Sequence, residues 1–188
     1  MDRLVRLCLW GLAMLLNAVL THLTAILLLP EVATRDAYHR LADAYGGGPG
    51  MILLPPAKPG DHVVPFRDPA VVQGVCFFDL AKAPVRIKAN IEEGRMLSLS
   101  FRTRTGKIFY SMTDRGALDR KIDVRLVSEA QLAELEARDD ENKAPAPELR
   151  LQAPSATGLV VATALIARPG EQDGAEVRIK AVTCRPDP

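Results

Sequence analysis

The stretch from Gly74 to Ala89 reads GVCFFDLAKAPVRIKA, and its periodicity decides the fold. In its second half Val85, Ile87 and Ala89 alternate with charged residues, which is the pattern of a half-buried β-strand. Its first half has the character of a second strand, with Cys76 in the middle. A cysteine in that position is an inert core residue, a nucleophile, a metal ligand or half of a disulfide. The compartment that the chain occupies decides among these roles.

Further strand patterns follow toward the C-terminus. Alternation in LSLSFRT and a turn around Gly106 predict a β-hairpin over Leu97–Met112. The segment KIDVRLV (121–127) alternates in the same way. The segment GLVVATALIA (158–167) is apolar throughout, which predicts a strand buried on both faces. These strands predict a mainly β chain, built as an antiparallel β-sandwich or open barrel with one or two short helices.

Helical signals in this region are few. Ser128 and Gln131 form a capping-box pattern that predicts a short helix ending near Arg138. The charged, proline-bearing segment Asp139–Glu148 predicts an exposed loop. The final segment EQDGAEVRIKAVTC (171–184) fits a strand or a helix, and we favour the helix.

The N-terminus carries a long apolar segment, Leu7–Leu29, without a Lys, Arg, Asp or Glu. Its length suffices to cross a hydrocarbon core of about 30 Å as a helix. A cleaved signal peptide is the alternative, but its apolar region is typically about 7 to 15 residues and ends at small residues. Here the segment ends at the bulky LLLP, so an uncleaved transmembrane anchor over residues 1–29 is favoured.

Residues 30–61 form the predicted connection between the anchor and a β-domain at 62–188. Helical spacing of apolar residues after Thr34, a plausible N-cap, predicts a short juxtamembrane helix that stops at Gly46. The glycines and prolines that follow predict a linker with one small apolar anchor, MILL.

Orientation is not decided by charge, because Arg3 and Arg6 precede the apolar segment while Arg35 and Arg40 follow it. A short basic tail before a first span is the usual signal-anchor arrangement, and long domains cross the membrane largely regardless of their charge. We therefore predict that the N-terminus lies inside and the β-domain outside.

Polar residues within the apolar segment share one helical face at positions Asn17, Thr21 and Thr24. One interpretation is a hydrogen-bonding face that pairs with another transmembrane helix. The other is that these polar atoms bond to the backbone of their own helix, and the sequence does not separate the two.

A resemblance to a known group rests on DPAVVQGVCFFDLAKAPVRIKANI and LSLSFRTRTGKIFYSMTDR. These segments are similar to the β-domain of bacterial envelope proteins grouped as domain of unknown function twelve-fifty-four, and HLTAILLLPEVATRDAYHRLA is similar to their membrane anchors. The matching residues are Asp79, Leu80, Ala83, Pro84, Val85, Phe101, Gly106, Phe109 and Tyr110. The larger members have a second β-domain, and residues 62–188 are expected to form one. The resemblance implies a single-pass protein of the bacterial inner membrane with a periplasmic domain, and it leaves the function open.

Outside the cytoplasm, Cys76 and Cys184 would be the only two thiols of the β-domain, because Cys8 lies in the apolar segment. Such a compartment lacks a reducing glutathione pool, so we expect a disulfide between them. Closing so long a loop is worth at most about 4.7 kcal/mol in the loop-entropy account. Two unrelated buried thiols are the alternative, and they are expected if the domain is cytoplasmic.

Catalytic and cofactor signals are weak. His39 and His62 have no metal-type partner at helical spacing, and no G-x-S-x-G elbow occurs. Structural roles are expected for Asp79, Glu92 and Asp114. We therefore assign no catalytic residue, no metal and no cofactor, and the balance of 24 Lys and Arg against 23 Asp and Glu does not suggest a nucleic-acid surface.

Two functions fit these observations. The first is a non-catalytic envelope protein in the lipid bilayer whose β-domain docks a protein partner or another envelope component. The second is a membrane-tethered enzyme or small-ligand binder with a pocket between the sheets, around Tyr110 and Asp114. We prefer the first, because no catalytic set can be named.

Overall fold

The structure is a computed structural model that describes residues 2–32, 36–117, 119–139, 148–168 and 170–187. It divides into two units, Met1–Asp36 and Ala37–Pro188. The first unit is the helix α1 (Asp2–Val32), and no lysine, arginine or acid interrupts it between Arg6 and Pro30. Within the described residues one helix, Asp2–Leu29, is long and apolar enough to cross a membrane or to act as a signal sequence, with a mean hydropathy of 2.1.

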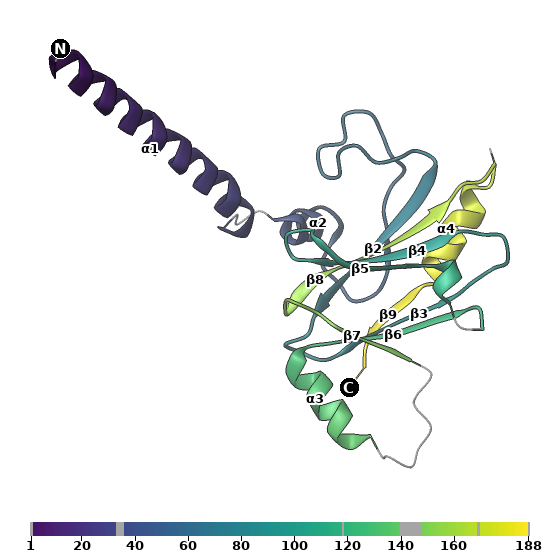
Figure 1. The fold of residues 1–188 in the computed structure, drawn as a ribbon. Coiled ribbons are helices and arrows are strands. Elements are labelled where there is room, and N and C mark those ends of the chain that lie inside the picture. Colours follow the sequence, from purple (N-terminus) through teal and green to yellow (C-terminus); the bar gives the residue numbers. More distant parts are fainter. Residues whose placement is uncertain (1, 33–35, 118, 140–147, 169, 188) are drawn as a thin grey trace. The chain divides into compact units, whose positions relative to one another are not determined.

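The second unit contains two β-sheets (Figure 1). The five-stranded sheet is antiparallel throughout, in the order β1 (Ile52–Leu53), β2 (Val71–Asp79), β8 (Thr157–Leu165), β4 (Leu97–Thr103) and β5 (Ile108–Thr113). The four-stranded sheet has the order β7 (Leu149–Gln152), β6 (Lys121–Val127), β3 (Val85–Asn90) and β9 (Thr183–Pro186). Its β6–β7 pair is parallel, and its other pairs are antiparallel.

Helices and a turn complete this unit. They are α2 (Ala37–Tyr45), the 3₁₀ turn η1 (Asp114–Gly116), α3 (Glu129–Arg138) and α4 (Gln172–Ala181). The Ser128 hydroxyl accepts from Gln131 N–H and the Gln131 side chain accepts from Ser128 N–H, so the predicted capping box begins α3.

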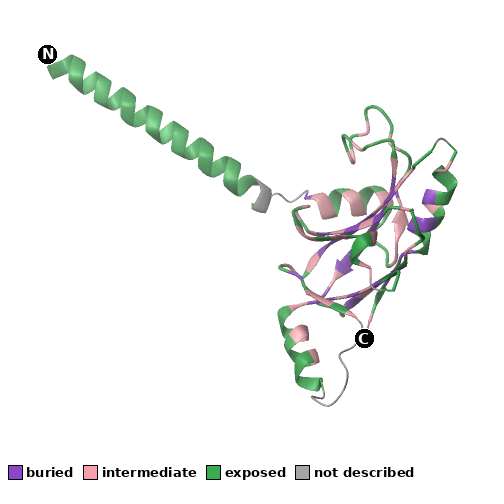
Figure 2. Ribbon diagram, turned by 45° about the vertical axis from the view of Figure 1, so that its right-hand side comes forward, coloured by how far each residue is buried: buried purple, intermediate pink, exposed green. Residues whose placement is uncertain are grey.

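The main core lies between the sheets. Alternate residues of each strand face inward, so Cys76 and Phe78 of β2 pack with Leu99 and Phe101 of β4 and with Ile87 of β3. All five are at most 1% exposed. Figure 2 shows the buried residues following the strands of both sheets.

The five-stranded sheet is also covered on its outer face. Val75 and Phe77 of β2 and Leu159 of β8 form a second core with residues of α2, such as Tyr38. The Tyr38 ring meets Phe77 edge-on, with centroids 5.3 Å apart. Because both faces of β2 and β8 are buried, these strands are almost continuously apolar in sequence.

Helix α4 approaches the inner face of this sheet at Gly74. A Cβ at that position would lie 2.5 Å from Cγ2 of Ile179, so glycine is what allows the helix side chain to reach the strand. Ala175 and Ile179 of α4 are fully buried there.

The predicted fold class is confirmed, since a long apolar helix precedes a two-sheet, strand-dominated unit. The predicted strands at 85–89 and 121–127, the hairpin and the doubly buried strand are all present. The final segment is helical over α4, as favoured, and then forms strand β9, so both expectations hold in part.

Three differences from the sequence-based prediction appear. The predicted linker holds strand β1 and the buried Leu54, and these residues together with α2 belong to the compact unit of the sheets. Strand β7 was not predicted, and its parallel pairing departs from a purely antiparallel sandwich. The predicted N-cap Thr34 and positions 140–147 of the predicted loop lie outside the described residues.

Candidate functional site

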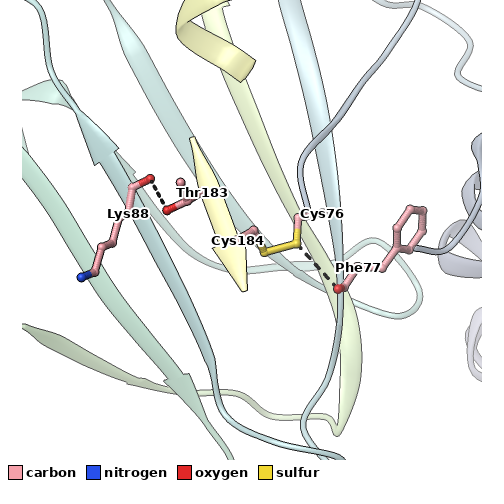
Figure 3. The surroundings of a disulfide bond; sticks show 5 residues. All are labelled: Cys76, Phe77, Lys88, Thr183 and Cys184. Carbon is pink, nitrogen blue, oxygen red and sulfur yellow. Dashed lines mark hydrogen bonds between the residues drawn. A yellow bond between two sulfur atoms is a disulfide. The ribbon is translucent and has the colours of Figure 1, made fainter. Parts of the chain in front are cut away.

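Cys76 and Cys184 form a disulfide that links the two sheets (Figure 3). Cys76 belongs to β2 of the five-stranded sheet, and Cys184 belongs to β9 of the four-stranded sheet, where it pairs with Ile87. Their Cα atoms are 6.5 Å apart, and 108 positions separate them in sequence. The bond therefore links strand β9 to the core strand β2. Its two cysteines are the pair that the sequence predicted.

The predicted pocket residues Tyr110 and Asp114 make packing and turn contacts. The Tyr110 ring packs near Phe101, with centroids 5.9 Å apart. Asp114 begins η1, and its carbonyl oxygen accepts from Ala117 N–H at 3.2 Å. Neither residue lines any of the cavities described below, so the structure gives both of them packing or turn roles.

The predicted polar face of α1 consists of exposed side chains within its unit. The Thr24 hydroxyl donates to the Leu20 carbonyl oxygen of the same helix at 2.8 Å. This bond matches the second interpretation of that residue, while Asn17 and Thr21 stay predictions.

The carboxylates considered as catalytic candidates have structural contacts. Asp79 accepts from Ala81 N–H at 3.2 Å and pairs with Lys82 at 3.1 Å in the turn after β2. Among the described residues, every carboxyl group with a shifted pKa has it lowered, by donors or cations: Asp61, Asp123, Asp139 and Glu171. A general acid needs a raised pKa, so these groups are suited to ion pairing.

A long loop between β1 and β2 is the most distinctive surface feature of this unit. Residues 54–70 contain five prolines and no helix or strand. Loops of this length without secondary structure are uncommon in compact domains and are usually functional.

Hydrogen bonds brace the loop internally and against α2. Oδ1 of Asp61 accepts from the N–H groups of Val63 and Val64, at 2.9 and 3.3 Å. These two bonds and the Arg67 side chain lower the pKa of Asp61. Arg67 donates to Pro55 O at 2.7 Å and to Asp61 Oδ2 at 3.0 Å. Arg40 of α2 donates to the carbonyl oxygens at 62 and 63, at 2.7 and 3.0 Å.

Phe66 is the residue that this braced loop presents to solvent. Its side chain is fully exposed, and its backbone has φ +60°. The left-handed region costs a non-glycine residue about 1–2 kcal/mol. Strained backbone that presents an apolar side chain to water is typical of binding sites rather than of packing.

A cavity of about 270 Å³ lies beside this loop, on the outer face of the five-stranded sheet. Its walls come from α2, the loop, β2, β8 and β4. The apolar part of the lining includes Leu41, Leu54, Val75, Leu159 and Val161. Arg102 of β4 extends into the same lining. In the sequence, Arg102 is only a polar position of the alternating segment LSLSFRT.

The outer face of the four-stranded sheet is different, because three of its arginines, Arg86, Arg125 and Arg150, are paired with acids. Arg86 of β3 donates to Asp123 of β6 at 2.8 Å, and Arg125 donates to Asp187 at 2.7 Å. Glu148, whose side chain is 5% exposed, lies 3.3 Å from each of the guanidinium groups of Arg86, Arg125 and Arg150. This face is a solvated ion-pair network that joins β3, β6, β7 and the C-terminus.

Comparison with known proteins identifies a fold and no activity. No protein-family model and no curated protein matches the sequence. The VPA0106 protein from Vibrio parahaemolyticus has a similar crystal structure, with a TM-score of 0.54 and 13% identity over 80% of this chain and 34% of that one. An uncharacterised protein from Burkholderia cenocepacia is matched with a TM-score of 0.45 and 10% identity, over 80% of this chain and 39% of that one. The chain thus spans little more than a third of either protein, and what it shares with the Vibrio protein is the fold.

Proposed function

We propose that this chain is a single-pass inner-membrane protein whose β-domain lies in the periplasm and docks a protein partner without catalysing a reaction. The partner is another envelope protein, and the bilayer holds the N-terminal helix. The loop 54–70 and its exposed Phe66 form the contact surface.

Two features support the location. Helix α1 has the length and apolar composition of an anchor. The second unit holds a disulfide between sheets, a bond that persists in oxidising compartments and is rare in the cytosol. A domain that is both membrane-linked and disulfide-bonded fits the outer side of a bacterial inner membrane.

The single observation that carries the docking function is the presentation of Phe66. Aromatic side chains dominate the binding energy of protein interfaces, and rigid loops bind with a smaller ordering cost than flexible ones. Here Asp61, Arg67 and Arg40 hold the loop while Phe66 stays in solvent. A braced loop with an exposed aromatic residue is an arrangement suited to inserting that residue into a partner's pocket.

We also propose a relationship to the envelope proteins grouped as domain of unknown function twelve-fifty-four. It is supported by the sequence motifs around Asp79 and Pro84, which stand at the turn between β2 and β3. Superposition on a solved two-domain member tests it. The same strand order in both sheets is expected, and a different order would remove the relationship.

The docking function is tested by quantitative co-purification from membranes with the full-length chain. We expect Phe66→Ala to lose most of one specific co-purifying envelope protein. Val177→Ala is the matched control, because Val177 is also an exposed apolar residue, on α4. Equal recovery with both variants would reject Phe66 as a contact.

The location is tested separately by a phosphatase fused after Pro188. Activity is expected, because the enzyme folds only outside the cytoplasm. An inactive phosphatase together with a fluorescent cytoplasmic reporter at the same position would reject the periplasmic placement.

A further inference from the structure

The cavity beside the loop combines apolar walls with one cation, Arg102, whose terminal nitrogens have no acceptor among the described residues. Its three arginines are Arg40, Arg67 and Arg102, and its one acid is Asp68. Arg40 and Arg67 donate to backbone carbonyl oxygens of the loop, and Arg67 also pairs with Asp61. Both are therefore engaged in holding the wall of the cavity.

Arg102 is in a different situation. Its Nε donates to Ser100 Oγ at 3.2 Å, and among the described residues no acceptor contacts its two terminal nitrogens and no acid pairs with it. Burial against the sheet lowers the pKa of its guanidinium group. A partly desolvated guanidinium with free donors is in the state that an anion stabilises most.

The position of Arg102 follows from the strand alternation. Residues 97, 99 and 101 of β4 face the main core, so residue 102 faces outward. On neighbouring β8 the outward residues at that level, Leu159 and Val161, are apolar and buried. The cation is thus fixed on a rigid strand at the border of an apolar surface.

We propose that this cavity binds a small molecule that carries one carboxylate on a compact apolar body, with the carboxylate paired to Arg102. A planar guanidinium accommodates a carboxylate through two parallel N–H···O bonds. The other two arginines of the lining, Arg40 and Arg67, already donate to carbonyl oxygens of the loop. Oδ1 of Asp68, the one acid of the lining, accepts a hydrogen bond from Ala70 N–H at 2.8 Å. This bond partly compensates the negative charge of Asp68.

The volume limits the size of the ligand. A cavity of about 270 Å³ holds the equivalent of about nine waters at ~30 Å³ each, so a body of about nine non-hydrogen atoms fits. Benzoate has this size and chemistry. Its uncharged analogue benzamide has nearly the same shape, and acetate has the charge without the body.

This site goes beyond the docking function and does not depend on it. Phe66 also lines the cavity, although its side chain is fully exposed. The two proposals are therefore separated at Arg102, because Arg102→Gln tests ligand binding without changing Phe66.

The test is calorimetric titration of benzoate into the full-length chain in detergent, with a titration into detergent alone subtracted. We expect saturable binding with a dissociation constant on the order of 0.1–1 mM, normal for so small a ligand. Benzamide and acetate should bind at least about tenfold more weakly, because benzamide lacks the carboxylate charge and acetate lacks the apolar ring.

Variants locate the binding. Arg102→Gln should weaken the affinity for benzoate by about tenfold or more. Arg102→Lys keeps the charge without the planar guanidinium, so its affinity should lie between those of the unmodified chain and Arg102→Gln. The matched control Arg115→Gln, an exposed arginine of η1, should bind as the unmodified chain does. Circular dichroism checks that Arg102→Gln is folded. Absence of saturable binding, equal binding of benzamide, or unchanged affinity in folded Arg102→Gln would each overturn the proposal.

Discussion

The outer faces of the two sheets use arginine in opposite ways. On the four-stranded sheet Arg86 and Arg125 each contact an acid from another strand or the C-terminus, and Glu148 lies among three guanidinium groups. On the five-stranded sheet Arg102 has a serine hydroxyl for a neighbour and an apolar cavity beside it. The first face pairs Arg86 and Arg125 with acids of the same chain, and the second leaves the Arg102 guanidinium beside an apolar cavity without an acid.

The comparison extends to what covers each face. Helix α2 and the braced loop lie over the five-stranded sheet, whereas the four-stranded sheet presents its ion pairs to solvent. Surface ion pairs contribute little individually to stability, so that network acts mainly in fixing strand neighbours. The binding functions that we propose therefore both belong to the five-stranded sheet.

The largest effect is expected from separating the two sheets. Replacing Cys76 and Cys184 by alanine should lower the free energy of unfolding by about 2–5 kcal/mol, because the unfolded chain regains the freedom of a long closed loop. Urea unfolding of the full-length chain followed by circular dichroism measures it. Cys8→Ala is the control, since Cys8 is an exposed thiol of α1, and it should change nothing. Equal stability of the double variant would mean that the bond does not hold the sheets.

The next effect concerns the packing of the five-stranded sheet alone. A Cβ on Gly158 would lie 2.3 Å from the Arg102 carbonyl oxygen and 2.4 Å from Cζ of Phe78. Gly158→Ala should therefore cost about 1–3 kcal/mol by overpacking. Gly116→Ala, where the nearest atom is 3.9 Å away, is the control for the same substitution. A harmless Gly158→Ala in the same unfolding assay would show that the strands there separate freely.

Smaller changes in stability are expected when a charged residue is replaced on either outer face, and they should differ between the two faces. Asp123→Asn should lower stability by about 1 kcal/mol or less at neutral pH, because Arg86 loses its main acceptor. Arg102→Gln should change stability by no more than about 0.5 kcal/mol, because no acid pairs with it. The reverse order of the two effects would contradict the comparison.

The ionisation of Asp123 should make the stability of the chain depend on pH. The hydrogen bond from Arg86 lowers the pKa of Asp123, against the opposing effect of burial. Its stabilisation is therefore complete above the ordinary aspartate value of about 3.9 and is lost as the pH falls through the lowered pKa. Unfolding of the unmodified chain and of Asp123→Asn across this range should converge at low pH. If the free energies of unfolding of the two chains differed by the same amount at every pH, the Asp123–Arg86 ion pair would not be the cause of the difference.

The smallest effect on stability is expected at Phe66. Glycine accepts φ +60° without strain, but it also gives the unfolded chain more freedom, so Phe66→Gly should change stability by no more than about 0.5 kcal/mol. Partner recovery should nevertheless fall. Loss of more than 2 kcal/mol in thermal unfolding, a size typical of core positions, would instead place Phe66 in the structural framework.

Periodicity predicted the regular parts of the fold and failed at its edges. The alternation of Leu97, Leu99 and Phe101 predicted β4 and the hairpin, because each inward residue contributes to one core. Strands β1 and β7 are short edge strands, and β1 is followed closely by Pro55 and Pro56. In such segments pairing with a distant strand, rather than local pattern, decides the conformation.

The cavity could not be predicted because it is assembled from distant segments. Arg102 was visible as an outward residue, and the continuous apolar character of 158–167 indicated that the neighbouring outward face is covered. Those two signals together point to a cation at the edge of a buried surface. What covers the face is helix α2, from the predicted juxtamembrane helix, and the loop 54–70, whose residues up to 61 were predicted to be a linker.

The most direct test of the claim that binding belongs to the five-stranded sheet and its loop is site-specific photo-crosslinking in living cells. A photoreactive residue is placed in the full-length chain at Phe66 or at Lys88, an exposed position on the outer face of the four-stranded sheet. We predict an adduct with one envelope protein from position 66 and none from position 88. Adducts from position 88 alone would contradict the account.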